Sequence, residues 1–270
     1  MSKLGDIIVQ KHGAGGPAMR ALIEQVFVKG LGASGASLAS MDDGAVIPVG
    51  DRFLILTTDS YVINPPFFPG GDIGRLAISG TVNDLAMMGA TQPLGLTCAV
   101  VIEAGFALVD LERIRDSMAA TCQEAGASIV TGDTKVMGKG ELDGIVINTA
   151  GVAWADRVVP DCGLRPGDRI IVTGSMGDHG FAVMTVRHKL QGEGQLLSDV
   201  APLNSMVRAA LAAGEVHAMK DPTRGGLASA LHEMASKSGV GIVLDEVAVP
   251  VRPEVRAASE LLGIDPLHVA

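Results

Sequence analysis

The sequence has few aromatic residues, few cysteines and no excess of positive charge. One Trp, one Tyr and six Phe occur in 270 residues, so Val, Ile, Leu, Ala and Met must fill most of any core. Cys98, Cys122 and Cys162 show no paired spacing, which argues against a disulfide framework or a cysteine zinc site and fits a reducing compartment. The net charge of −9 argues against broad binding to nucleic acid or to an anionic membrane.

Long apolar runs and the common nucleotide-binding fingerprints are also missing. No uncharged apolar stretch approaches the roughly 18 residues of a membrane span, and the segment Met1–Asp6 does not resemble a signal peptide. Neither a Walker A sequence nor a Rossmann fingerprint occurs. We therefore expect a soluble cytoplasmic protein, and any nucleotide site in it must use a different loop.

Helical and extended patterns alternate along the chain without a strict βαβ order, which predicts an α+β fold. Pro17 opens one helical pattern, Asp110 is placed to cap another, and Gly126 is placed to end it. Further helices are predicted over 73–88, 111–125, 202–213 and 226–238, and strands over 45–49, 53–57, 94–102, 128–131, 145–154 and 169–173.

A segment rich in glycine, proline and charge, Asp161–Asp168, is the best candidate for a domain boundary. We divide the chain into a glycine loop and helix (1–41), a first domain (42–156) and a second domain (157–270). No internal repeat is found.

The segment Gly132-Asp133-Thr134-Lys135 follows an apolar run and carries the strongest chemical signal. Side chains alternate across a strand, so an extended Asp133 and Lys135 lie on the same side. A carboxylate beside an ammonium suits a phosphate held through a metal ion. The alternative is a surface ion pair in a turn.

Further aspartates recur at predicted strand ends and in a helix. Asp43 precedes a strand, Asp59 lies near the end of one, and Asp221 precedes a helix. Asp84 lies in a helix on a small and apolar stripe, where an ionised carboxylate is costly without a cation or several donors. A carboxylate that caps a neighbouring loop is the alternative for Asp84. Together, aspartates that can converge favour a magnesium and phosphate site.

Two glycine clusters precede helices. His12-Gly13-Ala14-Gly15-Gly16-Pro17 would let backbone amides approach a phosphate at a helix N-terminus, although a flexible turn is the commoner explanation for such a cluster alone. Arg224-Gly225-Gly226 is a second glycine cluster before a predicted helix, and Arg224 adds a guanidinium that can bind a phosphate. His179 is more simply a structural residue, and no Ser-His-Asp or Cys-His arrangement is present.

In this order the motifs resemble the ATP-binding superfamily of aminoimidazole ribonucleotide synthetase, selenophosphate synthetase and thiamine phosphate kinase. Within it, Phe67-Phe68-Pro69-Gly70-Gly71 and Gly177-Asp178-His179-Gly180 are similar to the HypE family of carbamoyl dehydratases. The resemblance covers 12–270. It implies an ATP-binding N-terminal domain whose mixed sheet forms a barrel spanning a homodimer. It also implies a C-terminal α+β domain derived from a ferredoxin-like fold, which we expect to be incomplete here.

The resemblance also assigns roles. It implies ATP and Mg²⁺ as cofactors, with Lys135 and Asp84 in catalysis. The implied magnesium ligands are Asp43, Asp59, Asp84 and Asp133. The implied nucleotide-binding residues are His12, Gly13, Gly15, Gly16, Asp59, Asn83, Thr134, Lys135, Asp221, Thr223 and Arg224.

The family's reaction uses ATP to dehydrate a thiocarboxamide on its C-terminal cysteine to a thiocyanate, which supplies cyanide to the iron of [NiFe]-hydrogenase. Its implied partners are a second copy of the chain, the carbamoyltransferase HypF and the HypC–HypD complex. Family members end in Pro-Arg-Ile-Cys, with an Asn-Glu-Gly segment just beyond the position of Ala270. We therefore expect this sequence to be a shortened form that cannot turn over a cysteine in cis.

Two alternatives stay open. One is another ATP-using enzyme of the superfamily; selenophosphate synthetase is disfavoured because no reactive cysteine precedes the glycine loop. The other is an ATP-binding docking scaffold without chemistry of its own.

Overall fold

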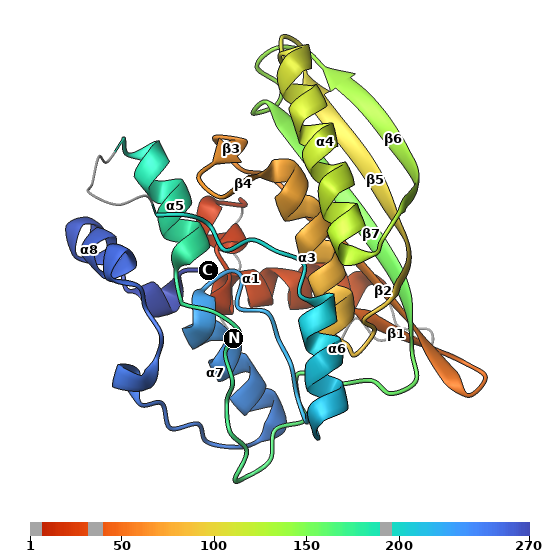
Figure 1. The fold of residues 1–270 in the computed structure, drawn as a ribbon, viewed down its shortest axis with the longest axis vertical. Coiled ribbons are helices and arrows are strands. Elements are labelled where there is room, and N and C mark those ends of the chain that lie inside the picture. The colour runs from red at the N-terminus through yellow and green to blue at the C-terminus, as the bar shows by residue number, and fades with distance from the viewer. Residues whose placement is uncertain (1–6, 32–39, 190–195) are drawn as a thin grey trace.

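A five-stranded mixed sheet forms the centre of the computed structural model, which describes residues 7–31, 40–189 and 196–270. The strand order is β1-β2-β7-β5-β6, as Figure 1 shows. Only β5 and β6 run parallel; the other neighbouring pairs are antiparallel. The strands are β1 (Ala45–Val49), β2 (Arg52–Tyr61), β5 (Pro93–Glu103), β6 (Ile129–Met137) and β7 (Ile145–Ala155).

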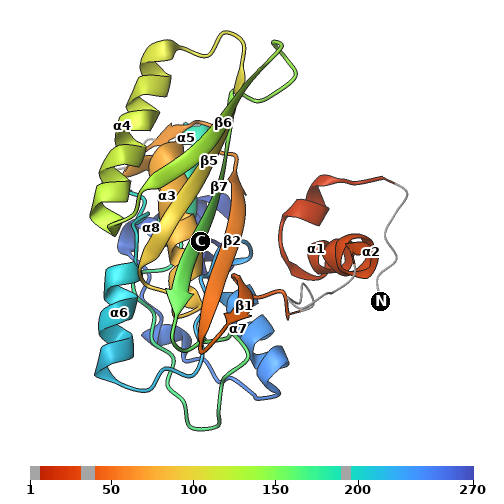
Figure 2. The same cartoon turned by 90° about the vertical axis from the view of Figure 1, so that its right-hand side faces the viewer.

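Two helices, α3 (Ile73–Met87) and α4 (Leu108–Ala125), cover one face of this sheet (Figure 2). Strand β7 alternates strictly, with every odd-numbered residue from Ile145 to Ala155 buried toward the helices. A Cβ added to Gly151 would lie 2.9 Å from Leu85 and Thr81, so this glycine lets α3 approach the sheet closely. As expected from the scarcity of aromatics, the main core is mostly aliphatic.

The second half of the chain consists of helices joined by irregular segments. These helices are α5 (Asp178–Arg187), α6 (Asn204–Ala213), α7 (Gly226–Ser238) and α8 (Pro253–Leu262). The strand predicted over 169–173 is wrong: the segment is irregular, and Ile171 is 86% exposed. A strand needs a neighbour to complete its hydrogen bonds, and none of the described residues from 156 onward forms one. This half therefore matches the expected α+β domain only in its helices.

Before the sheet, a short helical segment stands apart from it and approaches the second half at Gly15, which lies beside Arg224. It comprises η1 (Gln10–Gly13), α1 (Gly16–Leu22), the π-helical turn η2 (Ile23–Val28) and α2 (Lys29–Leu31). Pro17 lies in the first turn of α1, as predicted. In Figure 2 the segment stands clear of the sheet.

The observed element ends correct two predictions. Helix α4 begins at Leu108 with Ala107 as its N-cap, so Asp110 is not the cap but lies in the first turn, where it accepts a bond from Arg113. Strand β6 does not end at Gly132 but continues to Met137, because β5 pairs with it over its whole length. Gly126 ends α4 with a φ of 64°, as predicted.

Among the residues that the structure describes, no helix is both long and apolar enough to cross a membrane.

Candidate functional site

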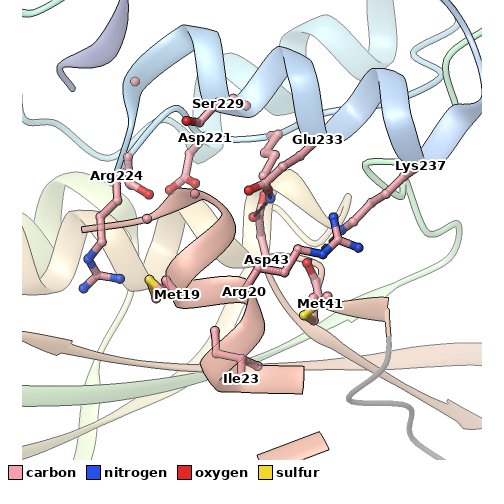
Figure 3. Close-up of a pocket in the computed structure, with 16 residues that line it drawn as sticks. Met19, Arg20, Ile23, Met41, Asp43, Asp221, Arg224, Ser229, Glu233 and Lys237 are labelled. Atoms are coloured by element: carbon pink, nitrogen blue, oxygen red, sulfur yellow. Dashed lines mark hydrogen bonds and ion pairs between the residues drawn. The ribbon is translucent and has the colours of Figure 1, made fainter. Parts of the chain in front are cut away.

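A cavity of about 180 Å³ lies between the start of α1 and helix α7 (Figure 3). Gly15 and Gly16 line it from the N-terminal segment, and Asp43 lines it from the turn before β1. The loop before α7 contributes Lys220, Asp221, Thr223 and Arg224. The cavity therefore joins three segments that are far apart in the sequence, and two of them carry the glycine clusters predicted to bind a nucleotide.

The glycine loop is held against Arg224. Gly15 has a φ of 82°, and a Cβ there would lie 3.0 Å from both the Cβ and the carbonyl oxygen of Arg224. Gly16 also has a positive φ, of 68°. His12 and Gly13 do not line the cavity. Instead, His12 is buried, and its Nδ1 accepts a hydrogen bond from the Val9 amide at 3.1 Å.

Four of the predicted aspartates converge behind this loop. Asp59 shares a face of β2 with the buried Thr57 and Tyr61. The Thr57 hydroxyl lies 2.8 Å from Asp84 Oδ2 and 3.0 Å from the backbone oxygen of Asp43, so it joins the segment before β1, β2 and α3 at one point. Asp59, Asp43 and Asp221 all lie close enough to raise the pKa of Asp84.

Full ionisation of these carboxyl groups would place more negative charge here than their surroundings balance. Burial, followed by the charge of Asp221, raises the pKa of Asp84 to about 9. Burial and the charge of Asp43 raise the pKa of Asp221 to about 7. The pKa of Asp43 is also raised by burial, although the Lys220 ammonium opposes the shift. Such a cluster favours the entry of a cation.

Asp43 provides the most direct sign of a missing positive partner. Its Oδ1 lies 2.9 Å from Lys220 Nζ, but its buried Oδ2 has no hydrogen-bond partner among the residues that the structure describes. Carboxylate oxygens are the ligands that Mg²⁺ prefers, so the residues fit this ion. Within the described part of the chain, no three side chains are already placed to hold a metal ion. A magnesium ion here would take its remaining ligands from water and phosphate oxygens.

Asp133 and Lys135 lie elsewhere. They share one side of β6, as the alternation predicts, with Lys135 Nζ 4.0 Å from Asp133 Oδ2 and both side chains exposed. Residues directly opposite each other in neighbouring strands point to the same face. Asp133 lies opposite Ala99, which lies opposite Asn148 of β7. Asp59 lies opposite Thr149, the next residue of β7. Asp133 and Asp59 therefore point to opposite faces of the sheet.

The separation across the sheet is also large. Strands β5 and β7 lie between β6 and β2, which amounts to three spacings of about 4.8 Å, or roughly 14 Å. Within one chain, the structure thus brings Asp43, Asp59, Asp84 and Asp221 together but not Asp133, Thr134 or Lys135.

Asn83 is engaged in packing between the two halves. Its side chain donates to the Ala201 carbonyl at 3.0 Å and accepts from the Leu203 amide at 2.7 Å. These two bonds fix the segment before α6 on α3. The nucleotide-binding role expected of Asn83 has no counterpart in the cavity lining.

A group of charged residues around the cavity was missed from the sequence. Asp161 is buried and accepts from Lys237 at 2.6 Å, while Lys220 Nζ lies 3.5 Å away. Its backbone amide donates to Asp42 at 3.2 Å. A signal was available: Lys220 directly precedes Asp221, and Ser229, Glu233 and Lys237 recur every four residues on one face of α7.

Comparison with known proteins agrees with the order of these motifs. Residues 41–155 match the N-terminal domain of AIR synthase related proteins, and residues 165–270 match the C-terminal domain. Carbamoyl dehydratase HypE of Rhizobium leguminosarum is 51% identical over 268 residues, covering 96% of this chain and 74% of that protein.

Solved structures of hydrogenase maturation proteins are similar as well. A structure described as a HypE–HypF complex aligns with a TM-score of 0.86 at 46% identity, covering 93% of this chain and 81% of the solved one. HypE in complex with ATP aligns with a TM-score of 0.79 at 42% identity, covering 98% and 78%. The chain therefore belongs to the HypE family of carbamoyl dehydratases, within the AIR synthase related proteins.

Proposed function

We propose that the chain is an ATP-dependent carbamoyl dehydratase that supplies cyanide for the iron centre of [NiFe]-hydrogenase. The carbonyl oxygen of a cysteine thiocarboxamide attacks the γ-phosphorus of ATP, and the bond to the bridging oxygen breaks so that ADP leaves. The C–O bond then breaks, phosphate leaves with that oxygen, and loss of the two amide protons gives the thiocyanate. Phosphorylation turns a poor leaving group into a good one.

One observation carries the proposal: the glycine loop, Arg224, Asp43 and Asp221 line one cavity in a member of the HypE family. Asp84 does not line the cavity but is joined to Asp43 through the Thr57 hydroxyl. The amides of Gly15 and Gly16 and the guanidinium of Arg224 suit phosphate oxygens. Asp43 and Asp84 would hold Mg²⁺, with Asp59 and Asp221 beside them. When bound, Mg²⁺ neutralises phosphate charge.

We assign Asp133 and Lys135 a role across a homodimer. Their strand, β6, is an edge of the sheet with all nine residues exposed, and Val130 and Val136 are 66% and 70% exposed. An uncovered apolar edge strand favours pairing with another chain. A second copy would complete a barrel and present Lys135 and Thr134 to the partner's nucleotide, where Lys135 would act in catalysis. Residues 42–156 would form this ATP-binding, dimer-forming domain.

The wider pathway follows from the same assignment. A solved HypE structure contains HypF, and we propose a HypF-type carbamoyltransferase as the source of the carbamoyl group and a HypC–HypD complex as the cyanide acceptor. We place the reaction in the cytoplasm, since all three cysteines are free thiols.

An isotope experiment tests this function against a docking scaffold and a simple ATPase. A peptide cysteine thiocarboxamide labelled with oxygen-18 in its carbonyl would be incubated with the chain, ATP and Mg²⁺. The proposal predicts that the label appears in inorganic phosphate and that the peptide loses the elements of water. Phosphate released without the label, or no phosphate at all, would contradict it.

A further inference from the structure

Lys220 lies among three carboxylates at the wall of the cavity. Its Nζ is 2.9 Å from Asp43 Oδ1, 3.5 Å from Asp161 Oδ2 and 3.9 Å from Glu233 Oε2, and its side chain is 12% exposed. Burial lowers the pKa of Lys220, but the attraction of these carboxylates outweighs burial and raises it above its ordinary value. With three carboxylates within 3.9 Å of its nitrogen, the lysine supplies a positive charge at the site.

The carboxylates depend on Lys220 unequally. Asp161 has a closer cation of its own, Lys237 at 2.6 Å, and Glu233 is about one-third exposed to water. Asp43 is 8% exposed, and in the described part of the chain Lys220 is the single cation within ion-pair distance of it. Lys220 is thus chiefly the counter-ion of Asp43.

Asp43 is also the carboxylate with an unused acceptor atom, its buried Oδ2. A divalent cation that bound this carboxylate would lie beside the Lys220 ammonium. Two like charges repel strongly in a site from which water is largely excluded. The lysine side chain is long and rotatable, and it lines the same cavity as Gly15, Gly16 and Arg224. After moving away from Asp43, the ammonium would therefore still lie beside the proposed phosphate position.

We propose that Lys220 is an internal substitute for the divalent cation: it neutralises Asp43 until a divalent cation displaces it, and it then binds a phosphate oxygen of the nucleotide. The phosphate part of this statement rests on the proposed function. When a cation displaces Lys220 without nucleotide, the ion pair with Asp43 is simply lost. When nucleotide is present, the displaced ammonium forms a new ion pair with a phosphate oxygen. Cation and nucleotide should therefore bind with positive coupling, each raising the affinity for the other by the same factor.

Binding of Mn²⁺ to the nucleotide-free chain tests this role, with free Mn²⁺ measured by electron paramagnetic resonance. Lys220→Met removes the competing ammonium, so we expect Mn²⁺ to bind about tenfold more tightly than to the wild type. Lys220→Arg keeps the charge and should stay within about twofold of the wild type. With ATP added, the coupling between Mn²⁺ and ATP should shrink in Lys220→Met and persist in Lys220→Arg.

Lys237→Met is the matched control, since it removes the same charge from the same network but contacts Asp161 and not Asp43. It should tighten Mn²⁺ binding by less than about threefold through long-range electrostatics. An unchanged or weaker affinity in folded Lys220→Met, or an equal gain in Lys237→Met, would overturn the proposal. If circular dichroism shows that Lys220→Met is unfolded, the Mn²⁺ affinity of Lys220→Gln is measured instead, with the same results expected and the same results overturning the proposal.

The first titration contains no nucleotide, so it separates this proposal from the proposed function. A wild-type chain that binds Mn²⁺ but no ATP would contradict the dehydratase function. The comparison of Lys220 variants would still decide whether the lysine competes with the cation.

Discussion

Asp84 shows why a carboxylate can be kept inside this protein. It lies in the last turn of α3 with its Oδ2 on the Thr57 hydroxyl, and no lysine or arginine of the described chain pairs with it. An isolated buried charge is costly, so the carboxyl holds a proton and its pKa rises. A cation bound beside Asp84 would favour the ionised carboxylate again.

The raised pKa of Asp84 predicts a pH-dependent stability. The folded value of about 9 exceeds the ordinary 3.8, so between these values the folded state holds a proton that the unfolded state has lost. The free energy of unfolding therefore falls as pH rises through this window. Asp84→Asn should be more stable than the wild type by roughly 1–3 kcal/mol at pH 8 without metal, and by less at pH 5.

Urea unfolding in a chelator at pH 5 and pH 8 measures this difference. Equal offsets between Asp84→Asn and the wild type at the two pH values would contradict the assigned pKa. Added Mg²⁺ should stabilise the wild type and not the variant.

At the scale of elements, the contact between the glycine loop and the loop before α7 closes the cavity. Gly15→Ala would force an unfavourable φ and a clash with Arg224, so ATP should bind at least about tenfold more weakly. Gly30→Ala is the control, because its added Cβ meets no atom within 4 Å. Calorimetric titration compares the two, and equal affinities would show that the loop does not shape the site.

The edge strand β6 carries a separate prediction. The Lys135 side chain is 72% exposed, and its one ion pair within the described residues is the loose pair with Asp133 at 4.0 Å. Lys135→Ala should therefore reduce ATP hydrolysis by about a hundredfold while dimer formation changes little. Steady-state phosphate release and analytical ultracentrifugation measure the two effects. Loss of both to the same degree would point to a structural role.

Local patterns predicted the elements well and their assembly poorly. Strand β1 and helix α7 have the predicted bounds, because a short apolar run, helical spacing and flanking glycines are local signals. The face on which Asp133 lies depends on strand order, and the partner of Lys220 lies 177 residues away in the chain. Residue spacing predicts neither the face of Asp133 nor the partner of Lys220. The strand predicted over 169–173 does not form because no neighbouring strand pairs with it.

At the scale of the whole molecule, buried charges hold the segment that follows the sheet against helix α7. Asp161 follows the sheet in the chain and is held by Lys237 of α7. Asp161→Asn leaves a buried ammonium poorly paired, so the free energy of unfolding should fall by about 3 kcal/mol. Asp156→Asn is the control: its pair with Arg52 is exposed and should contribute less than about 1 kcal/mol. Urea denaturation compares the two variants; similar losses would show that Asp161 does not hold this segment on α7.

The central claim is that this chain binds ATP through a cation held by its buried aspartates. Calorimetric titration of ATP into the wild type and into Asp43→Asn, each with Mg²⁺ and with chelator, tests it most directly. We predict that ATP binding to the wild type requires Mg²⁺ and that Asp43→Asn weakens it at least about tenfold. Equal ATP affinity with and without Mg²⁺, or in the wild type and Asp43→Asn, would contradict this claim.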